Sequence, residues 1–417
     1  MQSGQTGTMT RSRWLAIVGY SLVGAATQLV WLNFAGITTV ASSRYGVSES
    51  AIGWLAQVFP LLYVVLAIPC GLVLDRWFRS ALLAGAVLTA AGACVRLIGD
   101  DFGWLLAGQL IASVAQPLVL NAVTGITGRY LPEKNRPTGI AIGTASIFAG
   151  MVIAFLLSAI FTTAASIPTM LTITAAFCAG SALVLAIAIR HPGPFELPTE
   201  AVPGLHPGSP APAHSPHPNR SALATTWGDP LIRRLCILAI FPFGVFVAMS
   251  TFAQALLEPA GVTGGTASTI LLVNVIAGVL GSATIPILVV RRHAESTLLV
   301  VSLTATAAAC VLLALAPGVL TGFVAITLIG LLLLPALPIV LELVERRTGE
   351  AEGTGAGLIW MAGNLGGLIV AVVVGLLVDH PLAAFLVMAA IALIAVPGAR
   401  ALRRPIAELR AQSTPQP

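Results

Sequence analysis

Aromatic and amide side chains inside long apolar runs are the residues of this sequence whose types and spacing could do chemistry. Trp31 stands in such a run, with Gln28 on the same helical face one turn earlier and Asn33 about 200° round the helix. An indole face attracts a cation by about 0.5 to 2 kcal/mol, and an amide offers both donors and an acceptor. We therefore interpret Trp31 and Gln28 as candidate contacts for a small solute. The alternative is that Trp31 only packs one helix against another.

Later apolar runs contain further residues of the same two kinds. Phe246 lies about 215 residues after Trp31, at an equivalent place in the second half of the sequence. Each amide could line a substrate cavity or bond one helix to its neighbour. The further candidates for the substrate site are Phe148, Gln254 and Asn364, and the other amides within the runs are Gln109, Gln116, Asn121 and Asn274.

The sequence has no group of residues with the spacing of catalytic machinery. The five cysteines have no paired spacing, which favours small apolar packing residues over disulfides or a metal site. His206, His214 and His217 lie in a proline-rich stretch that offers no preformed ligand geometry, so a linker is favoured over a metal site. We therefore expect no enzyme, no catalytic residue, no cofactor and no bound metal.

The composition places these candidates in a membrane. Hydrophobic residues make up 57% of the 417 residues, charged residues 9%, and the mean hydropathy is +0.95. An ordinary soluble domain is near a quarter charged. The net charge of +5 is explained by basic residues in the predicted cytoplasmic loops, which argues against a nucleic-acid-binding protein. We expect a monomer in a lipid bilayer, with a small-molecule substrate and no nucleic acid as partner.

Apolar stretches long enough to cross a bilayer, which takes about 20 residues of helix, recur along the whole chain. They predict an all-α integral membrane protein with twelve transmembrane helices. The first stretch is too long for the core of a signal peptide, and no cleavage pattern follows it, so we expect it in the mature protein. The predicted spans are 14–40, 51–74, 80–99, 103–126, 137–164, 168–190, 234–257, 266–290, 296–316, 319–341, 353–378 and 381–400.

The basic residues predict the orientation of the chain. Lys and Arg accumulate in cytoplasmic loops, and with a cytoplasmic N-terminus only Arg44 and Arg96 of the 21 basic residues fall outside. This predicts a multi-pass protein of the plasma (cytoplasmic) membrane with both termini in the cytoplasm. The expected parts are a cytoplasmic N-terminus at 1–13, a six-helix half at 14–190, a proline-rich cytoplasmic linker at 191–233, a second six-helix half at 234–400 and a cytoplasmic tail at 401–417.

The two halves share a faint internal repeat. The runs RPTGIAIGTASIFAG at 136–150 and EGTGAGLIWMAGNLG at 352–366 both begin near Thr-Gly and end on Gly. Transporters built from two related halves bind substrate near the midplane, at the interface between the halves. The alternative is chance similarity, because small residues recur at helix contacts.

The most specific motif is GLVLDRWFRS at 71–80, between the second and third predicted spans. It resembles the loop signature of the major facilitator superfamily, although Phe78 stands where a glycine is usual. A close-packing glycine, a carboxylate able to cap a helix N-terminus and arginine partners would form a latch that favours one access state. An ordinary turn with topogenic arginines is the alternative. The residues that match the signature are Gly71, Asp75, Arg76 and Arg79.

Several stretches resemble a narrower family. The segments WLNFAGITTVASSRYGVSESAIGWL, GACVRLIG, GQLIASVAQPLVLN and EGTGAGLIWMAGNLG are similar to parts of the feline leukaemia virus subgroup C receptor-related transporters. That family carries choline and ethanolamine and is linked to haem. The resemblance implies a major facilitator fold and an aromatic site for a quaternary ammonium group at Trp31 and Phe246, where Phe246 replaces a tyrosine. The family's two cavity glutamines fall on Phe148 and Asn364.

The expected function is that of a membrane transporter that moves a small organic solute, such as a cationic amine like choline, by rocker-switch alternating access. No ionisable residue falls near the centre of a predicted span, whereas proton-coupled transporters usually place one there. We therefore expect facilitative transport. Efflux of a drug or metabolite by a transporter of the same superfamily is the alternative, and a membrane enzyme or sensor fits less well because no catalytic domain is evident.

Overall fold

The computed structural model describes residues 13–132, 135–195, 227–292, 294–336, 339–340, 343–344 and 352–406. The segment 1–12, most of the proline-rich stretch and the end of the tail lie outside these ranges, and with them His206, His214 and His217. Within the described residues every regular element is a helix.

The helices of the first half are α1 (Trp14–Leu32), α2 (Thr38–Tyr45), α3 (Glu49–Val95), α4 (Phe102–Leu120), α5 (Val123–Tyr130), α6 (Arg136–Ile160), the 3-10 turn η2 (Ala164–Ser166) and α7 (Ile167–Ala188). Those of the second half are α9 (Pro230–Leu257), the 3-10 turn η3 (Glu258–Ala260), α10 (Gly264–Arg291), α11 (Glu295–Leu315), α12 (Val319–Leu333), α14 (Glu352–Gly375) and α15 (Pro381–Ala401).

The predicted membrane fold is confirmed. Eleven helical segments among the described residues are long and apolar enough to span a bilayer, and the shorter apolar helix Val319–Leu333 lies where the tenth of the twelve predicted spans was expected. The second and third predicted spans form one element, α3, which is interrupted by non-helical backbone at Trp77 (φ −135°, ψ 54°). The first span is shorter than predicted, because α1 ends at Leu32 and the chain turns before α2.

Side-chain caps explain where several helices begin. The Ser48 side chain accepts a hydrogen bond from the amide of Ala51 at the start of α3. Asp101 accepts from the amides of Gly103 and Trp104 at the start of α4. These bonds satisfy backbone donors that lack a partner in the first turn of a helix, so short polar residues between apolar runs set the helix boundaries.

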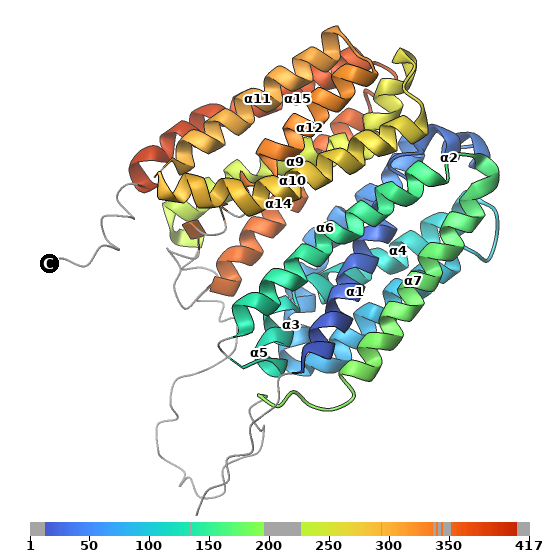
Figure 1. The fold of residues 1–417 in the computed structure, drawn as a ribbon, viewed down its shortest axis with the longest axis vertical. Helices are drawn as coiled ribbons and strands as arrows, with labels where there is room; N and C mark the ends of the chain where they lie inside the picture. Colours follow the sequence, from blue (N-terminus) through green and yellow to red (C-terminus); the bar gives the residue numbers. More distant parts are fainter. Residues whose placement is uncertain are drawn as a thin grey trace, which may run out of the picture.

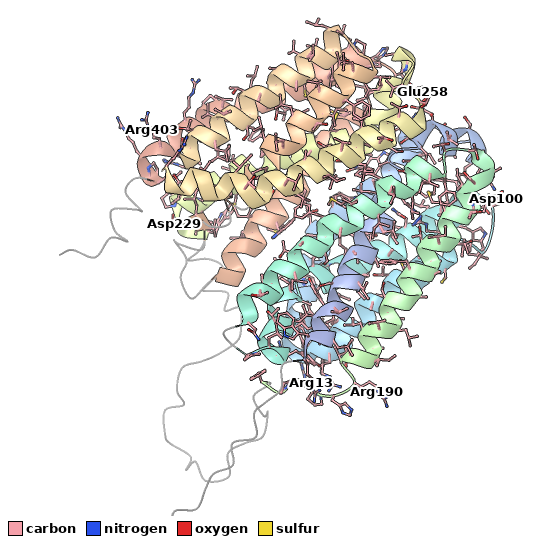
Figure 2. The ribbon with its side chains drawn as sticks, viewed as in Figure 1. Arg13, Asp100, Arg190, Asp229, Glu258 and Arg403 are labelled. Atoms are coloured by element: carbon pink, nitrogen blue, oxygen red, sulfur yellow. The ribbon has the colours of Figure 1, made fainter. Side chains whose placement is uncertain are left out.

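The helices form two bundles, one from α1 to α7 and one from α9 to α15 (Figure 1). Across the boundary between them α3 packs against α14, and α6 packs against α10. Charged residues mark the two ends of the bundles: Asp100 and Glu258 lie at one end, and Arg13, Arg190, Arg403 and Asp229 lie at the other (Figure 2).

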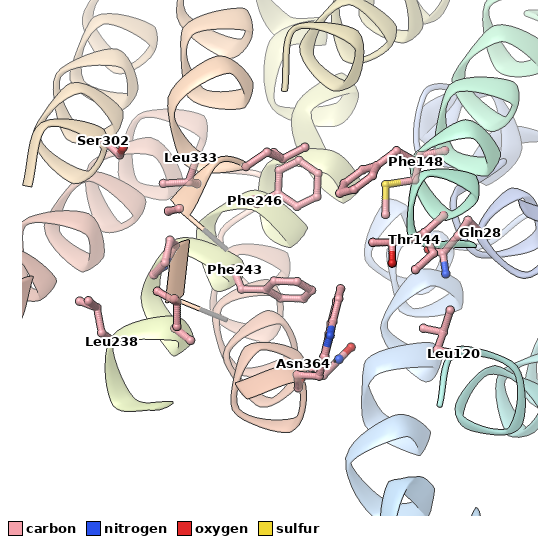
Figure 3. A pocket seen from close by; sticks show the side chains of 18 of the residues that line it. Gln28, Leu120, Thr144, Phe148, Leu238, Phe243, Phe246, Ser302, Leu333 and Asn364 are labelled. Atoms are coloured by element: carbon pink, nitrogen blue, oxygen red, sulfur yellow. Dashed lines mark hydrogen bonds between the residues drawn. The ribbon is translucent and has the colours of Figure 1, made fainter. Parts of the chain in front are cut away.

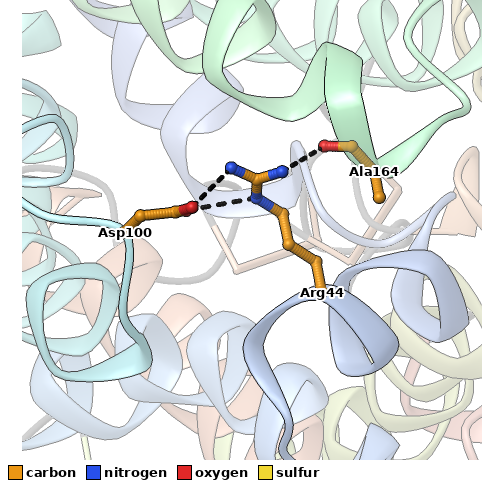
Figure 4. A network of polar contacts seen from close by, with 3 residues as sticks. All are labelled: Arg44, Asp100 and Ala164. Carbon is orange, nitrogen blue, oxygen red and sulfur yellow. Dashed lines mark hydrogen bonds and ion pairs between the residues drawn. The ribbon is translucent and has the colours of Figure 1, made fainter.

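An ion pair ties the connections of the first bundle together at the end that carries Asp100 (Figure 4). The Arg44 guanidinium of α2 donates to the two carboxylate oxygens of Asp100 at 2.7 and 3.2 Å and to the carbonyl oxygen of Ala164 at 2.7 Å. Because Asp100 is two-thirds exposed, water weakens this pair, and it serves mainly to hold α2, the α3–α4 turn and η2 in place.

Each bundle contains one close helix crossing, and the two crossings are equivalent. In the first bundle, a Cβ atom on Gly150 of α6 would overlap the carbonyl oxygen of Ala25 in α1. In the second, a Cβ atom on Gly366 of α14 would overlap the carbonyl oxygen of Ile240 in α9. These glycines end the two repeat runs of the sequence, so the repeat corresponds to a backbone contact that only glycine permits.

We expect Gly366→Ala to destabilise the protein by about 1 to 3 kcal/mol, because the added methyl group forces α9 and α14 apart in a packed interior. The measurement is the melting temperature of the purified protein. Gly180→Ala is the matched control, since a Cβ on this exposed glycine of α7 has no neighbour within 4 Å among the described residues. An equal melting temperature for Gly366→Ala and the control would contradict the close crossing.

Candidate functional site

A cavity of about 200 Å³ lies between the two bundles. Residues of α1, α4 and α6 line one side, and residues of α9, α11, α12 and α14 line the other (Figure 3). Five of the six residues predicted to contact substrate line this cavity: Gln28, Trp31, Phe148, Phe246 and Asn364.

The glycine crossings explain why these residues meet. On α1 and α9, the cavity aromatic lies six residues after the residue whose backbone touches the glycine. On α6 and α14, the cavity residue lies two residues before the glycine itself. The resulting equivalent pairs are Trp31 with Phe246, and Phe148 with Asn364.

The indole N–H of Trp31 is hydrogen-bonded to the protein, and the aromatic ring of Trp31 lines the cavity. Its Nε1–H donates to the carbonyl oxygen of Ala56 at 2.8 Å, and only 5% of its surface is exposed. The Phe59 ring lies behind it, with ring centroids 6.5 Å apart and planes tilted by 32°. Because the indole has no other polar atom, a solute in the cavity can interact with Trp31 only through the aromatic ring.

The other aromatic residues complete the wall. The side chains of Phe148 on α6 and Phe246 on α9 point toward one another from the two bundles (Figure 3). Phe243 and Trp360 also line it and form an edge-to-face pair, with centroids 6.1 Å apart and planes at 83°. Such pairs fix ring orientation, so the second bundle presents a preorganised aromatic surface.

Sequence reasoning missed Phe243 and Trp360, although a helical spacing signal was present. Phe243 precedes Phe246 by three residues and Trp360 precedes Asn364 by four, and residues at these spacings share a helix face. The helical spacing from Phe246 and Asn364 therefore predicts Phe243 and Trp360 as further cavity residues.

Amide groups supply the polar part of the cavity. Asn364 donates through Nδ2 to the carbonyl oxygen of Trp360 at 2.8 Å. Gln28 and Gln116 both line the cavity, and the amide oxygen of each is buried without a hydrogen-bond donor among the described residues. None of the described lining residues is ionisable. The described wall therefore combines aromatic rings with amide side chains whose acceptor oxygens at Gln28 and Gln116 are themselves buried, and it holds no fixed charge.

Gln254, the sixth predicted substrate contact, lies outside the cavity lining. Its Oε1 accepts from the backbone N–H of Thr39 at 2.9 Å, and its Nε2 donates to Thr39 Oγ1 and to Glu258 Oε2, each at 2.7 Å. Thr39 belongs to α2 and Gln254 to α9. The Gln254 amide thus joins the two bundles at the end that carries Asp100 and Glu258.

Further contacts close the same end. Gln57 Nε2 donates to Thr251 Oγ1 at 3.1 Å, and Ser268 Oγ donates to the carbonyl oxygen of Gly36 at 3.1 Å. Both bonds run from the first bundle to the second. The Phe252 ring packs so closely on Gly53 that a Cβ at this glycine would overlap it. The cavity is therefore shut off from this end by a set of neutral hydrogen bonds and a ring contact.

Arg96, one of the two basic residues predicted on the outer side, has a buried side chain. Arg96 follows the last residue of α3 and its side chain is 1% exposed. Its Nη1 donates to Gln109 Oε1 at 3.2 Å, and its guanidinium lies 5.4 Å from the centre of the Phe34 ring. The helix ends near the surface, but the long side chain lies within the first bundle.

Only part of the predicted latch can be placed. Arg79 donates through Nε and Nη2 to the carbonyl oxygen of Ile189, at 3.0 and 2.9 Å, and through Nη2 to that of Arg190. Arg76 is exposed and lies 4.6 Å from the centre of the Trp77 ring. No heavy atom among the described residues lies within 4 Å of a Cβ built on Gly71, so its expected close packing is not observed. The side chain of Asp75 lies outside the described part of the chain.

Two similar proteins align over most of this chain. Solute carrier family 49 member A3 of Danio rerio is 25% identical over 384 residues, which cover 86% of this chain and 77% of that protein. The choline/ethanolamine transporter flvcr2a of Danio rerio is 25% identical over 395 residues, which cover 89% of this chain and 81% of that protein. The predicted similarity to the choline/ethanolamine transporter family is thus confirmed.

The fold also matches solved structures. A bacterial homolog of the human lysosomal transporter Spinster, in an inward-facing and unoccupied conformation, has a TM-score of 0.72 at 14% identity, with 97% of this chain and 99% of that chain covered. The family model described as Major Facilitator Superfamily matches residues 14–371. With this match over a fold of two helix bundles around one cavity, the chain belongs to the Major Facilitator Superfamily.

Proposed function

We propose that this transporter moves a small organic amine, such as choline, across the plasma membrane by facilitative alternating access. The observation that carries the proposal is the joint lining of one cavity by Trp31, Phe148 and Phe246, which come from both bundles. The name of the relative flvcr2a, a choline/ethanolamine transporter, supports the same class of substrate.

The residues of the cavity wall support the binding of a cation by aromatic rings, without a carboxylate as counter-ion. Electron-rich ring faces attract a quaternary ammonium group by about 0.5 to 2 kcal/mol each, depending on desolvation. The amide oxygens of Gln28 and Gln116 are buried and lack a donor among the described residues, so either amide would accept a hydrogen bond from a solute hydroxyl or N–H group once its side chain turns toward the cavity. A molecule with an ammonium end and a donor end, as choline has, would use the rings and such an acceptor.

The contacts between the bundles support an inward-facing state. The end closed by Thr39, Gln57, Thr251 and Gln254 carries acidic residues, whereas Arg13, Arg190 and Arg403 lie at the opposite end. Because basic residues accumulate on the cytoplasmic side, we place the closed end outside and both termini inside. Transport would then require the outer hydrogen bonds to break while the inner end closes, in a single monomer.

Efflux of an apolar drug or metabolite is a second candidate function. It is favoured by the aliphatic residues Leu238, Leu299 and Leu303 in the cavity wall, which would suit an uncharged molecule. A neutral isostere of choline, 3,3-dimethylbutan-1-ol, separates the two functions, because it keeps the shape and the hydroxyl group but lacks the charge.

For the aromatic site we expect Trp31→Ala to weaken choline binding by about 1–2 kcal/mol, roughly five- to thirtyfold, because the ring face is lost. Trp31→Phe should retain part of the affinity, and Phe246→Ala should behave like Trp31→Ala. Affinity and melting temperature are measured on the same purified variants, with choline and with its neutral isostere.

Trp54→Ala is the control for that experiment, because Trp54 lies on the same bundle with 40% of its surface exposed, outside the cavity lining. It should leave choline binding unchanged. A loss of thermal stability with unchanged affinity in Trp31→Ala would make Trp31 a packing residue. Tighter binding of the neutral isostere than of choline would favour the efflux of an uncharged molecule.

Facilitative transport predicts independence from the proton gradient. Since no described residue of the cavity wall can take up a proton, an ionophore that collapses the pH difference should leave choline flux into proteoliposomes unchanged at a clamped membrane potential. Concentrative uptake that disappears with the pH difference alone would refute the facilitative mechanism.

The loop at 71–80 is proposed to bias the access states, with Arg79 as its anchor. Arg79→Gln removes charge-assisted bonds to the end of α7, and a loss of about 1 kcal/mol in this half-buried place corresponds to a roughly fivefold slower transport rate. Arg76→Gln is the matched control in the same loop, because Arg76 is exposed. Equal rates for the two variants at equal surface expression would remove Arg79 from the mechanism.

A further inference from the structure

Gln109 of α4 lies at a junction of three helices directly behind the aromatic wall. It is 1% exposed and lies outside the cavity lining, so it does not contact a solute there. Its Nε2 donates to the carbonyl oxygen of Val30 in α1 at 3.2 Å and to that of Leu55 in α3 at 2.9 Å. One amide group therefore joins α1, α3 and α4.

The two carbonyl groups that Gln109 binds each lie one residue before a partner of the indole hydrogen bond, which joins Trp31 to Ala56. Val30 immediately precedes Trp31, and Leu55 immediately precedes Ala56, whose carbonyl oxygen accepts the indole N–H at 2.8 Å. Gln109 thus fixes the backbone on the donor side and on the acceptor side of that hydrogen bond. A shift of α1 along α3 would break the Gln109 bonds and the indole bond together.

Arg96 determines which way the Gln109 amide points. A guanidinium group only donates hydrogen bonds, so Arg96 Nη1 holds the amide oxygen at 3.2 Å and leaves the amide N–H groups to face the two carbonyl oxygens. The Arg96 side chain reaches this place because Gly108 of α4 has no side chain there; a Cβ atom on Gly108 would overlap the Arg96 side chain.

The cost of burying Arg96 supports a role in orientation more than in stability. Its Nε and Nη2 atoms are buried without a hydrogen-bond partner, and no carboxylate among the described residues pairs with it. A buried cation without a carboxylate contributes little net stability, and buried charged groups can instead specify one arrangement of their neighbours. The arrangement specified here is that of the Gln109 amide and of the Val30 carbonyl oxygen, to which Arg96 Nη1 also donates a longer bond at 3.5 Å.

We propose that Gln109, oriented by Arg96, is a positioning residue that sets the Trp31 ring for substrate binding. The proposal adds a specificity-determining pair that lies outside the cavity, and it rests on the aromatic site proposed above. Its structural part, the control of Trp31 by Gln109, can be tested without any substrate.

The first experiment measures the environment of Trp31 by fluorine NMR on the full chain labelled with 5-fluorotryptophan. The Trp31 resonance is assigned by its loss in Trp31→Phe. Gln109→Glu places a carboxylate oxygen against the Val30 and Leu55 carbonyl oxygens, so we expect the Trp31 resonance to shift or split. If this variant does not fold, Gln109→Asn replaces it, because it keeps the amide but shortens its reach.

Thr89→Val is the matched control for this experiment. Thr89 is also 1% exposed within the first bundle, and its hydroxyl donates to the carbonyl oxygen of Gly85 in its own helix at 2.9 Å, with no other partner among the described residues. It should leave the Trp31 resonance in place even if it lowers the melting temperature. Arg96→Lys, which keeps the charge but loses the planar guanidinium group, should shift the resonance in the same direction as the Gln109 variants.

The second experiment is a double-mutant cycle for binding of choline to the purified protein. Gln109→Asn should weaken binding about five- to tenfold when Trp31 is present, and by less than about twofold in the Trp31→Ala background, because the effect acts through the ring. Equal losses in both backgrounds, or an unmoved Trp31 resonance in a folded Gln109 variant, would overturn the proposal. A shifted resonance in a protein that binds no choline would leave the positioning role intact and refute the proposed substrate.

Discussion

The close backbone crossing of α1 with α6, and of α9 with α14, is the constraint on which the cavity depends. Gly150 and Gly366 leave no room for a side chain at these crossings. Each crossing therefore fixes the distance and the rotation of two helices just before they reach the cavity. Because Trp31 and Phe246 follow their crossings at the same spacing, the two bundles present equivalent aromatic residues to one space. In a bilayer, where apolar surface between helices gives little driving force, such close packing is a main source of association.

The closed end is made of individually weak contacts, as the proposed transport cycle requires. Gln254 with Thr39, and Gln57 with Thr251, are hydrogen bonds between neutral groups, each worth about 0.5 to 1.5 kcal/mol. The attraction of a cation to a ring face has a similar size. Under the proposed alternating access, occupancy of the cavity would be large enough in energy to shift the balance between access states. The indole N–H of Trp31 binds the carbonyl oxygen of Ala56, which is followed by Gln57 of the closed end, so one peptide unit links the cavity to the closed end.

The buried cation Arg96 lies behind the cavity and not in its described wall. Arg96 is buried behind Trp31 with Gln109 as its side-chain hydrogen-bond partner, while the described cavity lining is aromatic, aliphatic and amide. A cationic solute would meet ring faces on one side of Trp31, with a guanidinium group in the same bundle behind it. Such a site gains its attraction from the rings alone, so their orientation must be well defined, and a network that fixes Trp31 has a physical reason to exist.

The sequence by itself determined the features that depend on composition and local pattern. Hydropathy gave the spans, the motif at 71–80 indicated the superfamily, and the internal repeat indicated Trp31 and Phe246 as an equivalent pair. Only the tertiary structure decided which face of each helix meets the cavity. It placed Gln254 among the contacts of the closed end and the Arg96 side chain inside the first bundle, and it added Phe243 and Trp360 to the aromatic wall. The reason is that membrane helices are apolar on the lipid side as well as inside, so polarity along the chain does not reveal their rotation.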